Sequence, residues 1–359
     1  MEVDVLIVGA GPAGSTTARY CAHNGIDVLV VDRRSEVGHP VQCGALLPFT
    51  EEMDSIFPRG TNLEELFDVD RRFVSAESEV IELISPGGRV YSVPFRSHIL
   101  DRRSFDKHNA KLASEAGAMI ETGHSLLSLK DGVARTTLGD IRAKVVVAAD
   151  GPNSRTARDA GMPNPSERYP AVTCQAEGSF GPEVKMFFGG LAPGGYGWVI
   201  PKGRKANVGL GLDPRISRLR PREAFERFTA TLGCKCEGVT CGIVPMSGPL
   251  PVTVKGRVLA VGDAAGQVMP TNGGGIPTAM MAGRIAGDVI RRHIEGGARL
   301  DEYEFRWRAV LEKPLMTSLR TRRLADVFFP HDGLLGAAMF ILGRRGLERT
   351  IRCKSARPL

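Results

Sequence analysis

Hydrophobic residues along this chain form short continuous runs, the pattern of strands buried in a parallel sheet. Val3–Val8 and Asp27–Val31 are two such runs, separated by a helix-forming stretch that Gly25 closes. Ala143–Ala149 is a third, and Val258–Val261 is a fourth that leads into the segment GDAAG. We expect this fourth strand to enter a second helix N-terminus. Together the runs predict an α/β unit.

Alternating polar and apolar positions, typical of half-buried strands, occupy other stretches of the chain. Val80–Ser85 and Arg89–Pro94 alternate on either side of the turn signal Pro86–Gly88. Residues 170–212 and 238–254 are also rich in strand-forming residues. These stretches interrupt the α/β unit, so we expect an inserted antiparallel sheet.

The fold class that follows is α/β, with a Rossmann-type unit, an antiparallel β-sheet substrate domain and a helical C-terminal segment. Helical spacing of apolar residues is found at Leu100–Ala118 and from Tyr303 to about Arg352. The expected bounds are 1–70, 98–165 and 255–298 for a discontinuous dinucleotide-binding domain, 71–97 and 166–254 for the substrate domain, and 299–359 for the basic helical segment.

The first strand leads into GAGPAG, which is followed by a predicted helix, a second strand and the acidic residue Asp32. In this pattern Gly9 makes the tight turn, Gly11 admits a pyrophosphate, and Gly14 lets the helix pack on the strand. Pro12 suits the first helical turn, whose N–H groups and dipole attract phosphate. Asp32 is placed to accept hydrogen bonds from a ribose. The segment therefore predicts a dinucleotide site.

The charge of the chain is concentrated near its end. Lysine and arginine exceed aspartate and glutamate by 7 over the whole sequence, and the last 61 residues hold 13 basic and 7 acidic residues. This segment is either a solvated helical surface or one attracted to anionic lipid. No nucleic-acid motif accompanies the charge, so nucleic acid is not an expected partner.

The apolar stretch Leu334–Leu342 is too short to span a bilayer, and no signal peptide fits before the first strand. We expect a cytoplasmic protein, and membrane association remains open.

The seven cysteines are scattered, at positions 21, 43, 174, 234, 236, 241 and 353. An odd number in a cytoplasmic chain argues against a disulfide framework. Cys234, Cys236 and Cys241 lack a second Cys-x-x-Cys and a paired histidine, so we expect no metal site.

Four segments occur in the order seen in FAD enzymes built like p-hydroxybenzoate hydroxylase. They are GAGPAG with Asp32-Arg33, LDRRSFD (Leu100–Asp106), AADGPNSRTAR (Ala148–Arg158) and GDAAGQVMPTNGGGIPTAM (Gly262–Met280). Within that superfamily the chain resembles the geranylgeranyl reductases, especially the archaeal digeranylgeranylglycerophospholipid reductases. The resemblance covers roughly residues 1–300.

Two further segments carry the closer resemblance. HPVQCGALL (His39–Leu47) resembles the reductase segment whose cysteine lies by the flavin, although Ala45-Leu46 replaces an acidic-glycine pair. PGGYGWVIP (Pro193–Pro201) resembles the P-x-x-Y-x-W-x-F-P lipid-site motif, with Ile200 in place of phenylalanine. Two glycines follow at the expected distance, Gly209 and Gly211.

The resemblance implies FAD as cofactor and a set of site residues. The cofactor-binding positions would be Gly9, Gly11, Ala13, Gly14, Asp32, Arg33, Cys43, Gly44, Arg103, Leu126, Asp263, Gly275 and Ile276. The substrate-binding positions would be Tyr196, Trp198, Ile200 and Lys202, and the catalytic candidate is Cys43.

Physical chemistry supports several of these positions independently. Asp263 could accept from the ribityl chain, and main-chain N–H groups of Gly273–Gly275 could meet the pyrimidine edge of the flavin. Arg103 is either a cation for the cofactor or a surface arginine. On a strand, Tyr196 and Trp198 would share a face with Ile200 and pack against a polyprenyl chain.

The implied reaction is saturation of isoprenoid C=C bonds, by hydride from reduced flavin N5 and a proton. Cys43 would gate the flavin ring, pass a proton through water, or only pack. The electron donor is open between ferredoxin, a deazaflavin and NAD(P)H.

Other flavoprotein activities are the alternatives. Flavin-dependent halogenases need an early lysine, and the first lysine here is Lys107, which argues against that activity. An aromatic monooxygenase and a non-catalytic flavin- or lipid-binding protein remain as alternatives.

Overall fold

The computed structural model describes residues 1–58 and 61–355 and divides into two compact units. The first unit comprises Met1–His39, Arg103–Arg168 and Pro245–Met316. The second comprises Pro40–Arg102, Tyr169–Val244 and Thr317–Leu359. Compared with the expected domains, residues 40–70 and 98–102 group with the β-sheet unit, as does most of the helical C-terminal segment. Residues 245–254 group with the first unit.

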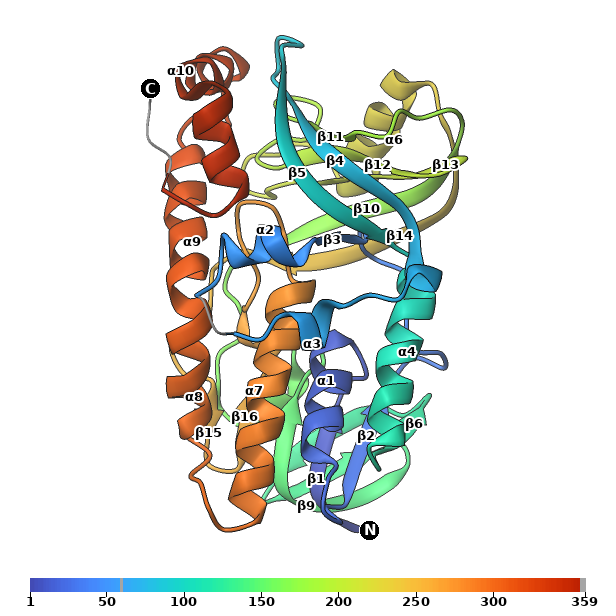
Figure 1. Ribbon diagram of the computed structural model, residues 1–359, viewed down its shortest axis with the longest axis vertical. Helices are drawn as coiled ribbons and strands as arrows, with labels where there is room; N and C mark the ends of the chain where they lie inside the picture. The colour runs from blue at the N-terminus through green and yellow to red at the C-terminus, as the bar shows by residue number, and fades with distance from the viewer. Residues whose placement is uncertain (59–60, 356–359) are drawn as a thin grey trace. The chain divides into compact units, whose positions relative to one another are not determined.

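The first unit is built on a largely parallel sheet with the strand order β15-β16-β9-β1-β2-β6 (Figure 1). β1 pairs in parallel with β2 on one side and with β9 on the other, as the continuous apolar runs predicted. The bounds are β1 Glu2–Val8, β2 Val28–Asp32, β6 Met119–Thr122, β7 Leu126–Lys130, β8 Val133–Thr136, β9 Gly139–Ala148, β15 Val254–Lys255 and β16 Val258–Ala260.

Two helices of this unit, α1 (Pro12–Cys21) and α7 (Ile276–Ile294), pack closely on each other. The contact requires glycine on α7, because a Cβ at Gly283 would lie 2.7 Å from the Ala13 carbonyl oxygen. A Cβ at Gly287 would lie 2.6 Å from the Cβ of Tyr20. The other helical segments are α4 Arg102–Glu115, α5 Arg155–Asp159, the 3₁₀ turn η2 Gly262–Ala265, α8 Glu302–Trp307 and the π-helical turn η3 Arg308–Glu312.

The second unit is built on a sheet with the order β14-β10-β13-β12-β11-β4-β5-β3. β10, β13, β12 and β11 pair antiparallel in that order, as do β4, β5 and β3, whereas β11 runs parallel to β4. The bounds are β3 Leu46–Pro48, β4 Val74–Ile84, β5 Val90–Leu100, β10 Arg168–Glu177, β11 Val184–Phe187, β12 Tyr196–Lys202, β13 Lys205–Gly211 and β14 Lys235–Pro245. The shorter helices are α2 Thr50–Asp54, α3 Glu64–Phe67, the 3₁₀ turn η1 Arg71–Phe73 and α6 Pro221–Leu232.

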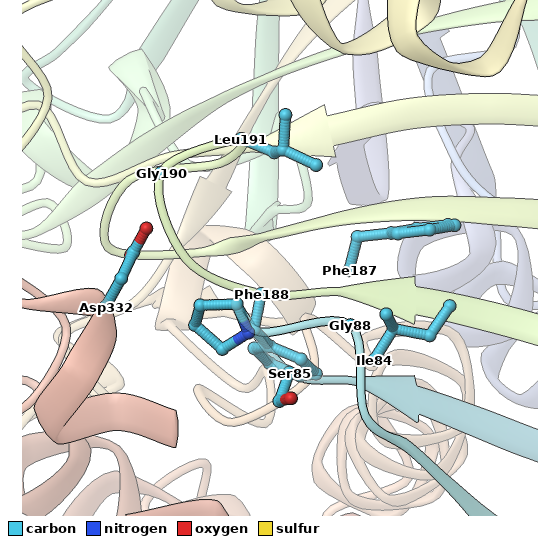
Figure 2. A pocket seen from close by; sticks show the side chains of 9 residues that line it. Ile84, Ser85, Gly88, Phe187, Phe188, Gly190, Leu191 and Asp332 are labelled. Carbon is cyan, nitrogen blue, oxygen red and sulfur yellow. The ribbon is translucent and has the colours of Figure 1, made fainter. Parts of the chain in front are cut away.

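Helix α10 (Asp332–Ile351) covers part of this sheet, and Gly343 interrupts it with a φ of +57°. Leu335 and Met339 join an apolar core that includes Trp198 and Ile200. A pocket of about 310 Å³ lies where the β4–β5 hairpin meets the loop after β11 (Figure 2), and its lining includes Ile84, Pro86, Phe187, Phe188, Leu191 and Asp332.

Helix α9 (Lys313–Ala325) enters the second unit and is anchored there by a buried polar network. The hydroxyl of Tyr169 donates to Asp213 and accepts from Arg322 of α9 at 2.6 Å. Arg322 is buried and also pairs with Asp326. Charged groups this well paired tolerate burial, which explains how a basic segment packs against a sheet.

Two local predictions were wrong. GDAAG forms the short 3₁₀ turn η2, and the long helix α7 begins only at Ile276. Cys174 and Cys236 form a disulfide between neighbouring strands β10 and β14, which the odd cysteine count did not suggest.

Candidate functional site

The first glycine loop joins β1 to α1 and has the geometry that a pyrophosphate needs. Gly9 has a φ of +107°, and a Cβ there would lie 2.3 Å from the Ala149 carbonyl oxygen. A Cβ at Gly14 would lie 1.8 Å from the Gly9 carbonyl oxygen, so glycine is required at both positions. At Gly11 a Cβ would meet nothing within 4 Å. The loop therefore leaves space beside the N-terminus of α1, where phosphate groups bind.

Asp32 ends β2 and braces this loop. Its Oδ2 accepts from the Ala10 N–H at 2.7 Å, and its Oδ1 accepts from the Arg34 N–H at 2.8 Å. Each carboxylate oxygen has a second lone pair, so Asp32 can still accept from a ribose hydroxyl. The neighbouring Arg33 is exposed.

The second glycine segment lies beside the first one within the same unit. A Cβ at Gly262 would lie 2.8 Å from the Cβ of Ala13, which places η2 next to α1. Asp263 Oδ1 lies 3.4 Å from the Cβ position of Gly275, the residue that caps α7. Ile276 is the first residue of that helix and is buried. The two glycine segments and Asp263 therefore lie side by side within the first unit, as a single cofactor site built from both would require.

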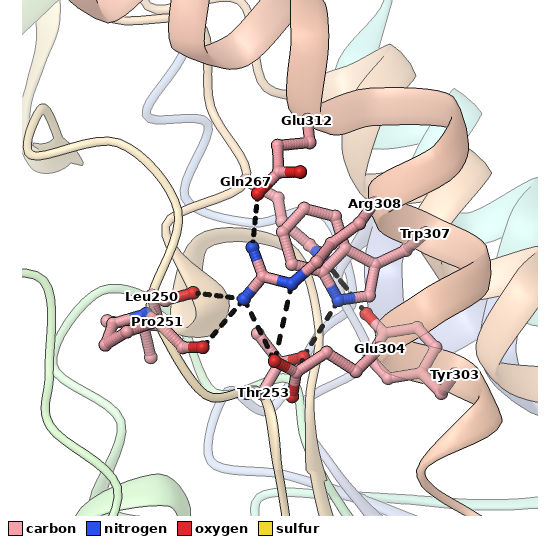
Figure 3. Close-up of polar contacts among 9 residues, drawn as sticks. All are labelled: Leu250, Pro251, Thr253, Gln267, Tyr303, Glu304, Trp307, Arg308 and Glu312. Atoms are coloured by element: carbon pink, nitrogen blue, oxygen red, sulfur yellow. Dashed lines mark hydrogen bonds and ion pairs between the residues drawn. The ribbon is translucent and has the colours of Figure 1, made fainter.

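A buried hydrogen-bond network holds this second segment in place, and Figure 3 shows its Gln267–Tyr303 contact beside the Thr253–Trp307 pair. Gln267 Oε1 accepts from the Gly262 N–H at 2.8 Å, and Gln267 Nε2 donates to the Tyr303 hydroxyl at 3.1 Å. The Gln267 carbonyl accepts from the Thr278 hydroxyl of α7. Trp307 donates to Thr253 at 2.8 Å nearby. Gln267 thus fixes the start of η2 relative to the start of α7.

Arg103 and Leu126 have different surroundings. The Arg103 guanidinium forms two hydrogen bonds to Glu36, at 2.6 and 2.8 Å, and Lys107 pairs with the same carboxylate. These two cations lower the pKa of Glu36 to about 2. Leu126 is buried in β7 opposite Thr136, so only its main chain is placed to bind a ligand.

The aromatic residues of the second unit project from one face of β12, as predicted. Tyr196 and Trp198 have ring centroids 5.9 Å apart, and Phe188 lies 6.0 Å from Tyr196. Trp198 donates through Nε1 to Asn207 Oδ1 at 2.7 Å, and Thr173 donates to the same oxygen. The indole ring is therefore held in one orientation.

The Cys43–Gly44 segment packs on this face of β12. A Cβ at Gly44 would lie 2.7 Å from Ile200 Cδ1 and 3.7 Å from Trp198 Nε1. Cys43 Sγ accepts from the Ala45 N–H at 3.3 Å. Burial, and secondarily the nearby Cys43, raises the pKa of the Tyr196 hydroxyl. The structure thus brings Cys43 and Gly44 close to the side chains of Tyr196 and Trp198 within one unit. We call these two aromatic side chains the aromatic wall.

Lys202 lies at the end of the same face. Its Nζ donates to the Leu100 carbonyl oxygen at 3.0 Å. Burial lowers the pKa of Lys202, and the nearby Cys43 opposes that change. Within the described residues, no cluster of three His, Cys, Asp or Glu side chains is arranged to hold a metal ion.

Comparison with known proteins agrees with this geometry. Residues 2–51 match the model of an FAD-binding domain. The paired glycine segments and the Rossmann-type sheet place the chain among the flavoproteins that bind FAD.

Residues 168–241 match the geranylgeranyl reductase catalytic domain, and the chain belongs to the geranylgeranyl reductase family. It is 35% identical to digeranylgeranylglycerophospholipid reductase 2 of Methanothermobacter thermautotrophicus, over 91% of this chain and 88% of the relative. It is 34% identical to reductase 2 of Methanopyrus kandleri, over 98% and 93%.

A solved structure shares the whole fold. The crystal structure of a geranylgeranyl bacteriochlorophyll reductase-like protein from Thermoplasma acidophilum aligns with a TM-score of 0.84 and 28% identity, over 95% of this chain and 91% of that one. A probable FAD-dependent monooxygenase from Pseudomonas aeruginosa aligns at 0.69 with 15% identity, over 95% and 100%, and shows the fold alone. The assignment as an FAD-dependent oxidoreductase therefore stands.

Sequence reasoning missed the residues that support the site. Gln267 lies inside the quoted segment GDAAGQVMP but carries no motif of its own. Asn207 precedes the glycines that were singled out, and Glu36 follows Asp32 by four residues. Only their contacts in the fold reveal what they hold.

Proposed function

We propose that this protein saturates the isoprenoid double bonds of geranylgeranyl lipids, either an archaeal-type phospholipid or a related polyprenyl compound. The observation that carries the proposal is the β12 face, where Trp198 and Ile200 lie against Gly44 and Tyr196 packs beside Trp198. This face belongs to the segment that matches the geranylgeranyl reductase catalytic domain. The relatives' names specify the same class of lipid.

The chain's part in this reaction is to bind the cofactor and to orient the alkene. Reduced FAD, when bound, supplies the hydride. We assign the cofactor to the loop residues Gly9, Gly11, Ala13 and Gly14, to Asp32 and Arg33, to Cys43 and Gly44, and to Arg103, Leu126, Asp263, Gly275 and Ile276. Main-chain N–H groups at the start of α7 would stabilise negative charge at the pyrimidine edge.

The alkene needs help because an isolated trisubstituted double bond is not electrophilic. A proton has to reach one carbon as a hydride reaches the more substituted carbon, where positive charge develops. The faces of Tyr196 and Trp198 would stabilise that charge and exclude water. Cys43 is the candidate for moving the proton, directly or through water.

Lys202 would bind the phosphate of the lipid head group. An ammonium group has three hydrogens, and the Leu100 carbonyl takes one of them. A phosphate would compensate the cost of burying this cation, which is the cost that lowers its pKa.

Electrons must reach the flavin between turnovers. Ferredoxin, a deazaflavin and NAD(P)H are the candidate donors, and anaerobic mixing of the oxidised protein with each one separates them by the rate of flavin bleaching. Peripheral contact with a membrane, where such a lipid resides, completes the proposal.

The test is anaerobic mixing of the photoreduced protein with a geranylgeranyl lipid while flavin absorbance is followed. We expect reoxidation without dioxygen, and loss of it in Trp198→Ala at unchanged flavin content. Reoxidation that required dioxygen and an aromatic substrate would instead identify a monooxygenase. If no lipid reoxidised the reduced flavin, the protein would instead be a non-catalytic flavin- or lipid-binding protein.

A further inference from the structure

The outer face of α10 is apolar where an exposed helix is normally polar. Leu334, Phe340 and Ile341 are 53%, 61% and 61% exposed. Their spacing places them on one side of the helix, whereas Leu335 and Met339 of the opposite side are buried in the core. No charged residue occurs from Gly333 to Gly343.

Basic residues border this face. Arg344 and Arg345 follow Gly343 directly and are exposed. Arg89, at the tip of the β4–β5 hairpin, has its guanidinium carbon 4.7 Å from the Phe340 ring centroid. Val90 beside it is 48% exposed. The hairpin tip and α10 therefore form one surface, the α10 face, with an apolar centre and positively charged edges.

The neighbouring pocket is lined in part by apolar side chains. It lies between the same hairpin and the first turn of α10 and includes Phe187, Phe188 and Leu191 (Figure 2). Asp332 is the acidic residue at this end of the helix, and its carboxylate lies close to Gly189 and Gly190.

We propose that the α10 face docks on the surface of an anionic lipid bilayer. Exposed large apolar side chains insert among the lipid chains, and arginines at the edge meet the head-group phosphates. Eleven uncharged residues cannot cross a bilayer, and no helix among residues 1–58 and 61–355 is long and apolar enough to do so. The helix would therefore lie in the interfacial plane.

Charge favours a lipid surface over a second copy of the chain. A two-fold contact through this face would bring like patches together, so Arg89, Arg344 and Arg345 of both copies would meet around an apolar centre. Anionic lipid neutralises the same charges. The inference rests on the proposed function for the membrane contact and names the surface that makes it, whereas the reduction itself does not depend on this surface.

The test is flotation of the full-length FAD-loaded protein with vesicles of phosphatidylcholine, with and without phosphatidylglycerol. We expect binding that needs phosphatidylglycerol and weakens with salt. The double variant Phe340→Glu/Ile341→Glu should lose at least tenfold in partitioning, and each of Arg344→Gln and Arg345→Gln about fivefold. Phe305→Glu is the matched control, because Phe305 is 78% exposed on α8 in the other unit.

Each outcome separates docking from catalysis. Flotation of the double variant equal to wild type would overturn the inference, as would a wild-type protein that ignored vesicles. A dimer that Phe340→Glu dissociated, in the absence of vesicle binding, would assign the face to a second copy. Reduction of detergent-dispersed lipid should be unchanged in all these variants, and failure of that reaction in wild type would count against the proposed reaction and not against the docking surface.

Discussion

Replacing Gln267 with methionine should weaken FAD binding without unfolding the protein. The side chain is fully buried and receives the Gly262 N–H at 2.8 Å while donating to Tyr303 at 3.1 Å. Methionine has a similar length but offers no comparable acceptor. The main-chain bond from Thr278 remains, so the start of α7 stays anchored.

The magnitude follows from the orphaned Gly262 N–H. A buried donor left without a partner costs about 1–3 kcal/mol. In the variant without FAD, the loop can shift so that water hydrates the Gly262 N–H. FAD binding then has to restore the original loop conformation, and this cost weakens the affinity for FAD. At about 1.4 kcal/mol per factor of ten, the dissociation constant of FAD would rise roughly 5- to 150-fold.

The assay is fluorescence titration of the apoprotein with FAD, alongside urea unfolding. Thr253→Val is the matched control, because it leaves the Trp307 indole N–H without its partner but does not contact the glycine loop. We expect both variants to lose stability and only Gln267→Met to lose FAD affinity. Equal FAD affinity in the two variants would refute the positioning role of Gln267.

Three other outcomes follow from the structure. Trp198→Ala removes a buried aromatic ring and should cost about 3–5 kcal/mol of unfolding free energy, with polyprenyl binding lost and FAD retained; unchanged lipid affinity would contradict the aromatic wall. Cys43→Ala should slow alkene reduction by about 10²- to 10⁴-fold if the thiol moves the proton, and unaltered turnover at equal flavin content would end that role. Because the pKa of Glu36 is lowered to about 2, its ion pairs stabilise the fold above the ordinary carboxyl pKa and are lost as pH falls through about 2; acid unfolding of Glu36→Gln should lack that component.

The fold was predictable wherever local pattern and global packing agree. The runs in β1, β2, β9 and β16 were visible because strands covered on both faces are continuously apolar. The second helix N-terminus was misplaced, since GDAAG has the composition of a helix start but its glycines adopt positive φ, at Gly262 and Gly266. The long helix α7 therefore begins later, at Ile276, with Gly275 as its N-cap residue.

The site was predictable at the level of motifs and not of their supports. The β12 face followed from period-two alternation of Tyr196, Trp198 and Ile200. Asn207, which fixes the indole, and Gln267 act through contacts distant in sequence, which no local pattern encodes. The Cys174–Cys236 pair is 62 residues apart, and its proximity depends on which strands become neighbours.

The most direct test of the central claim is the mass of the lipid product. The protein is reduced with dithionite under anaerobic conditions, mixed with an unsaturated archaeal-type phospholipid, and the lipid is analysed by mass spectrometry. The account predicts a gain of two hydrogens for each double bond, with matching reoxidation of the flavin. A lipid of unchanged mass beside a fully reduced flavin would contradict it.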